Sequence, residues 1–119
     1  MKKILFACSA IIIFCVFGCQ QDTVPVPEFD CEVERTYQND VALIIETNCA
    51  YSGCHIQGTP GVSDYSDYNK LAGAIESGVF RNRVLDTKTM PPANAPGPDE
   101  LSGEELEILN CWIEQGYPE

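Results

Sequence analysis

The segment from Asn48 to His55 contains two cysteines followed directly by a histidine, an order that is typical of covalent haem attachment. The thiols of Cys49 and Cys54 can each add across a haem vinyl group to give a thioether, and His55 is then held beneath the iron as its proximal ligand. The usual motif has two residues between the cysteines, whereas four lie here. The loop must therefore bulge, and Gly53 suits a bulge because glycine tolerates positive φ. A local disulfide with His55 merely beside it is the alternative.

A haem iron commonly takes a second axial ligand, and the chain offers one candidate. His55 is the only histidine, so two histidine ligands cannot come from one chain. Met90 is the only methionine besides Met1, and Pro91 and Pro92 follow it. Prolines fix their own φ and restrict the residue before them, so the loop is stiff and could hold a thioether sulfur opposite His55. The alternative role of Met90 is that of a flexible core residue.

Two predicted helices flank the cysteine segment. The first starts near Asn39 or Asp40, either of which can cap it, and runs to Asn48, so it delivers the chain to the first cysteine. The second runs from about Ser66 to Glu76 and carries apolar residues at the i, i+3, i+4, i+7 spacing of one helical face. Gly78 is expected to end it, since glycine is common just past a helix C-terminus.

The C-terminal part of the chain predicts a loop and a long final helix. Residues 79–84 are expected to form a short helix or turn, whereas the proline-rich stretch 91–98 can be neither helix nor central strand. Ser102 and Glu105 have the spacing of a capping box, and Trp112 lies on the apolar face of the helix that follows. We expect Trp112 to pack in the core against the first helix. No segment of the sequence shows a strand pattern, so the predicted fold is all-α.

The N-terminus predicts export and lipid attachment. Two lysines precede an apolar run of about 14 residues, which is shorter than the ~20 that a bilayer requires, so residues 1–18 are predicted to be a signal peptide. The sequence that ends in Cys19 resembles a bacterial lipobox, which makes Cys19 the expected lipidation site. Residues 19–30 contain two prolines and no apolar period, so they are predicted to be a tether. In the proteobacterial sorting scheme, Gln20 after Cys19 indicates the outer membrane.

Cysteine accounting leaves one pair without an assigned role. Cleavage of the signal peptide would remove two of the seven cysteines. Cys19 is the expected lipid attachment site, and Cys49 and Cys54 are the expected haem attachment sites. Cys31 and Cys111 remain, and in an oxidising compartment they are expected to form a disulfide. Closing a loop of about 80 residues would stabilise the fold by roughly 4–5 kcal/mol. The main alternative pairs all four cysteines as disulfides and leaves none for haem.

The charge balance restricts the partners. The chain has 7 basic and 18 acidic residues; after loss of residues 1–18, which include two lysines, the net charge is −13. Such a surface repels nucleic acid and anionic lipid headgroups, so neither is expected as a partner. Electrostatic steering toward a positively charged redox protein is one interpretation, and simple solvation of a secreted domain is the other.

Over residues 31–119 the chain resembles a class I cytochrome c. The resemblance is carried by the helix that enters the C-x4-C-H segment, by the later Thr-Met-Pro-Pro, by the Leu-Ser-x-Glu-Glu that opens the last helix, and by Trp112 within it. It implies a small bundle of three to four short helices around one covalent haem c. The residues that it implies as holding the haem are Cys49, Cys54, His55 and Met90. Some bacterial members use the wider cysteine spacing.

The predicted protein is a lipid-anchored, single-haem electron carrier that faces the periplasm. With His55 and Met90 filling both axial positions, the iron would have no open site, so no catalytic residue and no enzymatic activity are predicted. Redox partner proteins and the membrane, through the lipid, are the expected partners, and the oligomeric state is not predicted. Two alternatives stay open: a disulfide-stapled exported binding module without haem, and a haem ligand sensor or enzyme with an open axial site. A zinc or copper site is disfavoured because these ligands are not the usual set.

Overall fold

The structure, a computed structural model, describes residues 29–119, and every regular element in that range is helical. The elements in chain order are η1 (Tyr37–Val41), α1 (Ala42–Asn48), α2 (Tyr68–Glu76), α3 (Val79–Arg81), η2 (Asn82–Asp86) and α4 (Gly103–Glu114), where η marks a π-helical segment. The all-α prediction is therefore confirmed for these residues. None of these helices is long and apolar enough to cross a bilayer.

The predictions for the N-terminal region concern residues that the structure does not describe. The proposed signal peptide at 1–18 and the lipidation site Cys19 both lie outside the described range. So does the proposed tether at 19–30, apart from Phe29 and Asp30.

The first helical stretch starts earlier than the sequence suggested. Its N-cap is Thr36, whose hydroxyl accepts a hydrogen bond from the Asn39 backbone N–H, so the prediction of Asn39 or Asp40 as the cap is wrong. Asp40 instead accepts the Thr36 backbone N–H at 2.9 Å and pairs with Arg35 at 3.0 Å. These contacts, chiefly the Thr36 N–H, lower the pKa of the Asp40 carboxyl. The hydrogen bond with Thr36 and the ion pair with Arg35 thus both hold Asp40 at the entry to η1.

The second predicted helix forms with nearly the expected limits. Asp67 caps α2 by accepting the Lys70 backbone N–H, and Leu71 and Ile75 are buried on its inner face. Gly78 follows with φ of +74°, so the prediction that this glycine ends the helix is confirmed. The chain then turns directly into α3 and η2, which form the short helix expected over residues 79–84.

The capping box at the start of α4 is confirmed. The Ser102 hydroxyl accepts the Glu105 backbone N–H, and the Glu105 carboxylate accepts the Ser102 backbone N–H at 2.8 Å. Further along, Trp112 is fully buried, and its ring lies 6.1 Å from that of Tyr37 in η1. The indole N–H donates to the Pro118 carbonyl at 2.8 Å. Trp112 therefore packs in the core against the first helical stretch, as predicted.

A disulfide joins Cys31 to Cys111, 80 residues later, as the cysteine accounting predicted. The Gln115 side chain reinforces this connection by donating to the carbonyls of Cys31 and Val33. It also accepts the backbone N–H of Arg35 at 2.8 Å. These contacts attach the start of the domain to the end of α4. The cysteine segment lies at the other end of the bundle.

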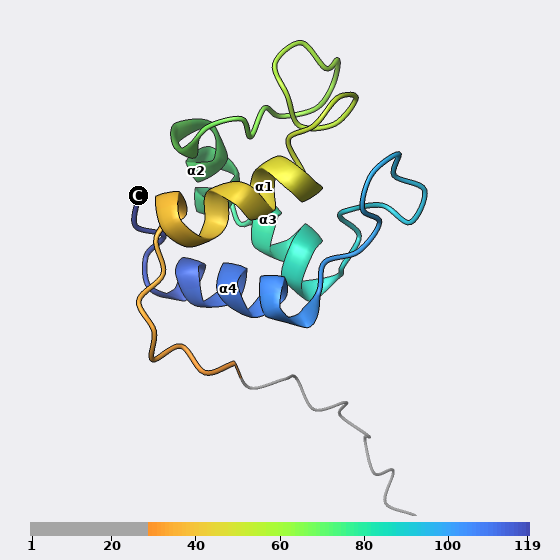
Figure 1. The fold of residues 1–119 in the computed structure, drawn as a ribbon. Coiled ribbons are helices and arrows are strands. Elements are labelled where there is room, and N and C mark those ends of the chain that lie inside the picture. Colours follow the sequence, from red (N-terminus) through yellow and green to blue (C-terminus); the bar gives the residue numbers. More distant parts are fainter. Residues whose placement is uncertain (1–28) are drawn as a thin grey trace, which may run out of the picture.

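Two long loops meet at that other end. Figure 1 shows α1 lying alongside α4, and a loop leaves the bundle where α1 ends and another where α4 begins. The first loop joins α1 to α2, and the second joins η2 to α4. The first contains the cysteine segment and the second contains the Met-Pro-Pro segment, so the fold brings together two parts of the sequence that are far apart.

Candidate functional site

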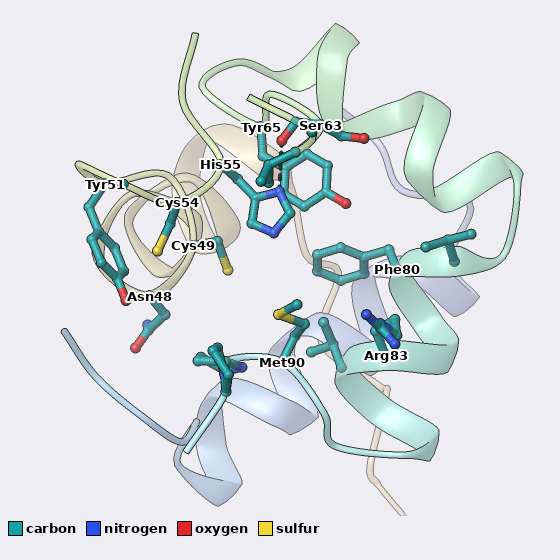
Figure 2. Close-up of a pocket in the computed structure, with 17 residues that line it drawn as sticks. Asn48, Cys49, Tyr51, Cys54, His55, Ser63, Tyr65, Phe80, Arg83 and Met90 are labelled. Carbon is teal, nitrogen blue, oxygen red and sulfur yellow. Dashed lines mark hydrogen bonds between the residues drawn. The ribbon is translucent and has the colours of Figure 1, made fainter. Parts of the chain in front are cut away.

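A cavity of about 430 Å³ lies between the two loops and the core, within the range of ~300–1,000 Å³ that is usual for cofactor pockets. Figure 2 shows the residues that surround it. They come from the end of α1, both loops, α3 and η2: Asn48, Cys49, Tyr51, Gly53, Cys54, His55, Gly61, Val62, Ser63, Tyr65, Val79, Phe80, Arg83, Val84, Met90, Pro91 and Pro92. All four residues that the sequence singled out as haem ligands or attachment points are among them.

The cysteine segment is a compact loop that follows the last turn of α1. The Cys49 N–H still donates to the Ile45 carbonyl at 2.9 Å, and the Cys49 carbonyl accepts the His55 N–H at 3.0 Å, which closes the loop on itself. Gly53 adopts φ of +86°, so the expected use of glycine in the bulge is confirmed. The wider spacing is thus accommodated within the loop, and α1 keeps its hydrogen bonding up to Cys49.

The His55 ring is held in a defined orientation. Its Nδ1 lies 2.7 Å from the Ser63 carbonyl oxygen, and because a carbonyl can only accept, Nδ1 must carry the proton. The ring also stacks on Tyr65, with centroids 4.0 Å apart and planes 3° from parallel. The Tyr65 N–H in turn donates to the His55 carbonyl at 2.9 Å. Nε2 therefore keeps its lone pair, which is the form in which a histidine binds a metal.

The two thiols of the segment are unpaired and differ in exposure. Cys49 is buried, whereas Cys54 is partly exposed, and neither takes part in a disulfide. Burial is the main cause that raises the pKa of the Cys49 thiol to about 12, with smaller effects of Cys54 and Glu105. A cysteine nucleophile needs a lowered pKa, so Cys49 has the opposite of the environment that thiolate catalysis requires. Because Cys31 pairs with Cys111, the alternative in which all four cysteines cross-pair is not what the structure contains.

Met90 reaches the cavity from the second loop. The backbone N–H groups of Thr89 and Met90 both donate to the Arg83 carbonyl, at 2.8 and 3.1 Å, so the loop is fastened to η2 where it begins. Figure 2 shows the Met90 side chain and the His55 ring pointing toward each other from opposite walls, with the Cys49 sulfur beside the space between them. The cavity therefore has two potential metal ligands, the imidazole of His55 and the thioether of Met90.

The two arginines of the α3–η2 segment have different surroundings. Arg81 donates to the Asn110 side chain at 3.2 Å and pairs with Glu114 at 3.5 Å, both on α4. Among the described residues that line the cavity, Arg83 is the only charged one. Within residues 29–119 its guanidinium has no hydrogen-bond or ion-pair partner in the protein. Arg83 is thus the arginine available to an anionic group in the cavity, whereas Arg81 connects α3 to α4.

One edge of the cavity is open to solvent, and apolar side chains line it. Val62 and Val79 border the cavity and keep 38% and 53% of their surfaces exposed. Deeper in, Phe80 and Val84 are buried. The cavity therefore has a mostly apolar interior and an accessible rim, which suits a flat, largely apolar group that touches solvent along one edge.

Sequence reasoning missed three parts of the site. Tyr65 stacks on the imidazole, Phe80 forms part of the inner wall, and the Ser63 carbonyl orients His55. An aromatic residue gives no sign of which neighbour it will stack on. A main-chain carbonyl gives even less, because every residue has one.

Within the described residues no three His, Cys, Asp or Glu side chains form a group that could hold a metal ion. A haem iron needs no such group, because the macrocycle supplies its other ligands. No protein-family model, no curated protein and no solved structure matches the chain. The case for a function therefore depends on the residues of this cavity.

Proposed function

We propose that residues 31–119 form a class I cytochrome c domain that binds one haem covalently and transfers electrons. The convergence of four residues at one cavity carries the proposal. Cys49 and Cys54 are the unpaired cysteines of the described range, His55 is the only histidine of the chain, and Met90 is the only methionine of the predicted mature protein. All four line the same space although Met90 is 35 residues from His55 along the chain.

The residues present fit the chemistry of this group. Haem, when bound, supplies an iron that takes up and releases one electron. The two cysteines would hold it as thioethers, and His55 has its Nε2 free because Nδ1 donates to Ser63. Met90 would provide the second axial position, and thioether ligation raises the reduction potential because it favours the reduced iron. The apolar wall that includes Phe80 would exclude water from the macrocycle.

The exposed rim is where electrons would enter and leave. Val62 and Val79 leave one edge of the cavity accessible, so a partner can approach there without opening the fold. With both axial positions filled, the domain would act as a carrier and not as an enzyme. The excess of acidic residues, 18 against 7 basic ones in the whole chain, favours a positively charged redox partner.

The N-terminal sequence supports an anchored carrier. Cleavage before Cys19 and lipidation of its thiol would attach the domain to a membrane that faces the periplasm, and Gln20 favours the outer membrane. Residues 19–30 would then serve as the tether between lipid and domain. Labelling of the full chain with a radioactive fatty acid, lost in Cys19→Ser, would test this part separately from the haem.

The direct test is expression of residues 20–119 in the periplasm together with a cytochrome c maturation system. We expect a mass increase of one haem that survives denaturation and is lost in Cys49→Ser/Cys54→Ser. We also expect low-spin bands and a far-red sulfur-to-iron band that Met90→Ala abolishes and Val62→Ala leaves intact. An unmodified mass with a second disulfide would refute the proposal and favour the exported binding module. High-spin iron in the unmutated domain would favour the sensor or enzyme with an open axial site.

A further inference from the structure

Tyr51 connects the two loops that form the cavity. It is the second of the four residues between the cysteines, and its ring lies against Gly97 in the proline-rich stretch after Met90. A Cβ atom built on Gly97 would lie 2.8 Å from Tyr51 Cζ and 3.0 Å from its hydroxyl oxygen. Real Cβ contacts do not approach that closely, so a side chain at position 97 would push the ring away.

The glycine at position 97 is explained by this contact and not by its backbone. Five glycines of the described range have positive φ, and Gly97 is not one of them. A larger residue would therefore suit its backbone conformation. Of the eight described glycines, Gly97 is also the one where an added Cβ meets another atom within 4 Å. A side chain at position 97 would therefore have to displace the Tyr51 ring, whereas glycine lets the ring lie against the loop.

The contact lies in the loop that joins η2 to α4, called the methionine loop below, in a part with few backbone hydrogen bonds. Its start is fastened by the two hydrogen bonds to Arg83, and its end by the capping box at Ser102. Between these points the described backbone hydrogen bonds include only one within the stretch, from the Ala95 N–H to the Pro92 carbonyl. Tyr51 supplies a side-chain contact between the middle of this loop and the cysteine segment. Figure 2 shows Tyr51 on the same side of the cavity as Cys54.

We propose that Tyr51 is a positioning residue for Met90, and that the wide cysteine spacing supplies it. Tyr51 packs on Gly97 and holds the methionine loop against the cysteine segment, so that the Met90 sulfur stays opposite His55. This inference rests on the proposed haem function. Loss of the contact should let Met90 leave the iron more often without affecting the two cysteines or His55.

Binding of free imidazole to the ferric, haem-loaded domain tests the proposal, because imidazole must displace Met90. Its apparent affinity is proportional to the fraction of molecules in which Met90 is off the iron. We expect Tyr51→Ala and Gly97→Ala each to raise that affinity by about fivefold or more and to weaken the far-red band. Tyr51→Phe keeps the ring against Gly97 but loses the hydroxyl, so it should stay closer to the unmutated protein than Tyr51→Ala does. Gly73→Ala is the matched control, because a Cβ atom added to this helical glycine meets no other atom within 4 Å.

The double variant Tyr51→Ala/Gly97→Ala distinguishes loss of the Tyr51–Gly97 contact from a general loosening of the methionine loop. If Gly97→Ala acts by displacing the Tyr51 ring, its effect should disappear once that ring is gone, to within about twofold. An unchanged imidazole affinity in both single variants would overturn the proposal. So would a Gly97→Ala effect that persists in full in the Tyr51→Ala background. The denatured mass reports haem attachment independently, so failure of the cytochrome proposal would be seen before any of these comparisons.

Discussion

The side-chain amide of Asn48 donates two hydrogen bonds, one to the Ile44 carbonyl at 3.0 Å and one to the Glu105 carboxylate at 2.9 Å. Asn48 is the last residue of α1, immediately before Cys49, and Glu105 belongs to the capping box of α4. One buried amide therefore joins the helix that carries the cysteine segment to the first turn of the final helix. This junction lies at the end of the bundle where the cavity forms.

Asn48→Ala should destabilise the haem-loaded domain by about 1–3 kcal/mol, since it leaves a partly buried carboxylate with one donor fewer. Urea unfolding followed by circular dichroism would measure the change. Asn94→Ala, at an exposed position in the second loop, is the control and should alter the free energy of unfolding by less than about 0.5 kcal/mol. Equal stability of the two variants would mean that the hydrogen bond contributes nothing.

The same junction predicts a dependence of stability on pH. Burial acts to raise the pKa of the Glu105 carboxyl, but hydrogen bonds from the Ser102 backbone and hydroxyl and from the Asn48 amide together lower it below 4.5. A carboxyl with a lowered pKa in the folded state stabilises the protein above its ordinary pKa, and this contribution is lost as the pH falls through the folded value. Glu105→Gln should therefore cost about 0.5–1 kcal/mol at pH 7 and progressively less below pH 4.5.

Unfolding of both proteins in urea from pH 7 to pH 3 would check the sign. The difference in unfolding free energy between the unmutated domain and Glu105→Gln should shrink as the pH falls. Glu100→Gln, at an exposed side chain, should run parallel to the unmutated domain throughout. A difference that grows toward acid pH would contradict the assignment of Glu105 as a stabilising carboxylate.

The disulfide should matter for stability and not for haem attachment. Replacing Cys31 and Cys111 together by alanine removes the closure of an 80-residue loop, which predicts a loss of roughly 4–5 kcal/mol. Because Cys49 and Cys54 lie at the opposite end of the bundle, the denatured mass should still include one haem. A lowered urea midpoint with an unchanged haem mass is the expected result. Loss of haem from the folded variant would show that the cysteines do not act as two separate pairs.

Local patterns predicted the helices well where the deciding contacts are local. The capping box of Ser102 and Glu105 lies within four residues, so it placed the start of α4 correctly. The first helix has three candidate caps within five residues; Thr36 is the cap, whereas the Asp40 carboxylate accepts the Thr36 N–H and pairs with Arg35. Propensity does not contain that information, so the predicted start at Asn39 or Asp40 was too late.

The candidate site was predictable to the extent that its chemistry depends on residue type. Histidine and methionine are scarce in this chain, so the sequence alone identifies His55 and Met90 as the candidate axial ligands. Their approach across one cavity could not be derived from spacing, because the fold of the loops determines it. The Tyr65 stack on His55 and the Tyr51 contact with Gly97 are tertiary packing, for which the sequence has no periodic signal.

The two arginines of the α3–η2 segment should differ in their effect on the reduction potential. Arg83 lines the cavity, and a cation there would favour the reduced form of the proposed haem, which has one more negative charge. Arg83→Gln should therefore lower the potential, by roughly 20–60 mV if the lost interaction is about 0.5–1.5 kcal/mol for one electron. Arg81→Gln is the matched control: its side chain contacts Asn110 and Glu114, so it should change the potential little. Redox titration of both variants would decide, and a larger shift in Arg81→Gln than in Arg83→Gln would contradict the proposal that Arg83 lies beside a haem in this cavity.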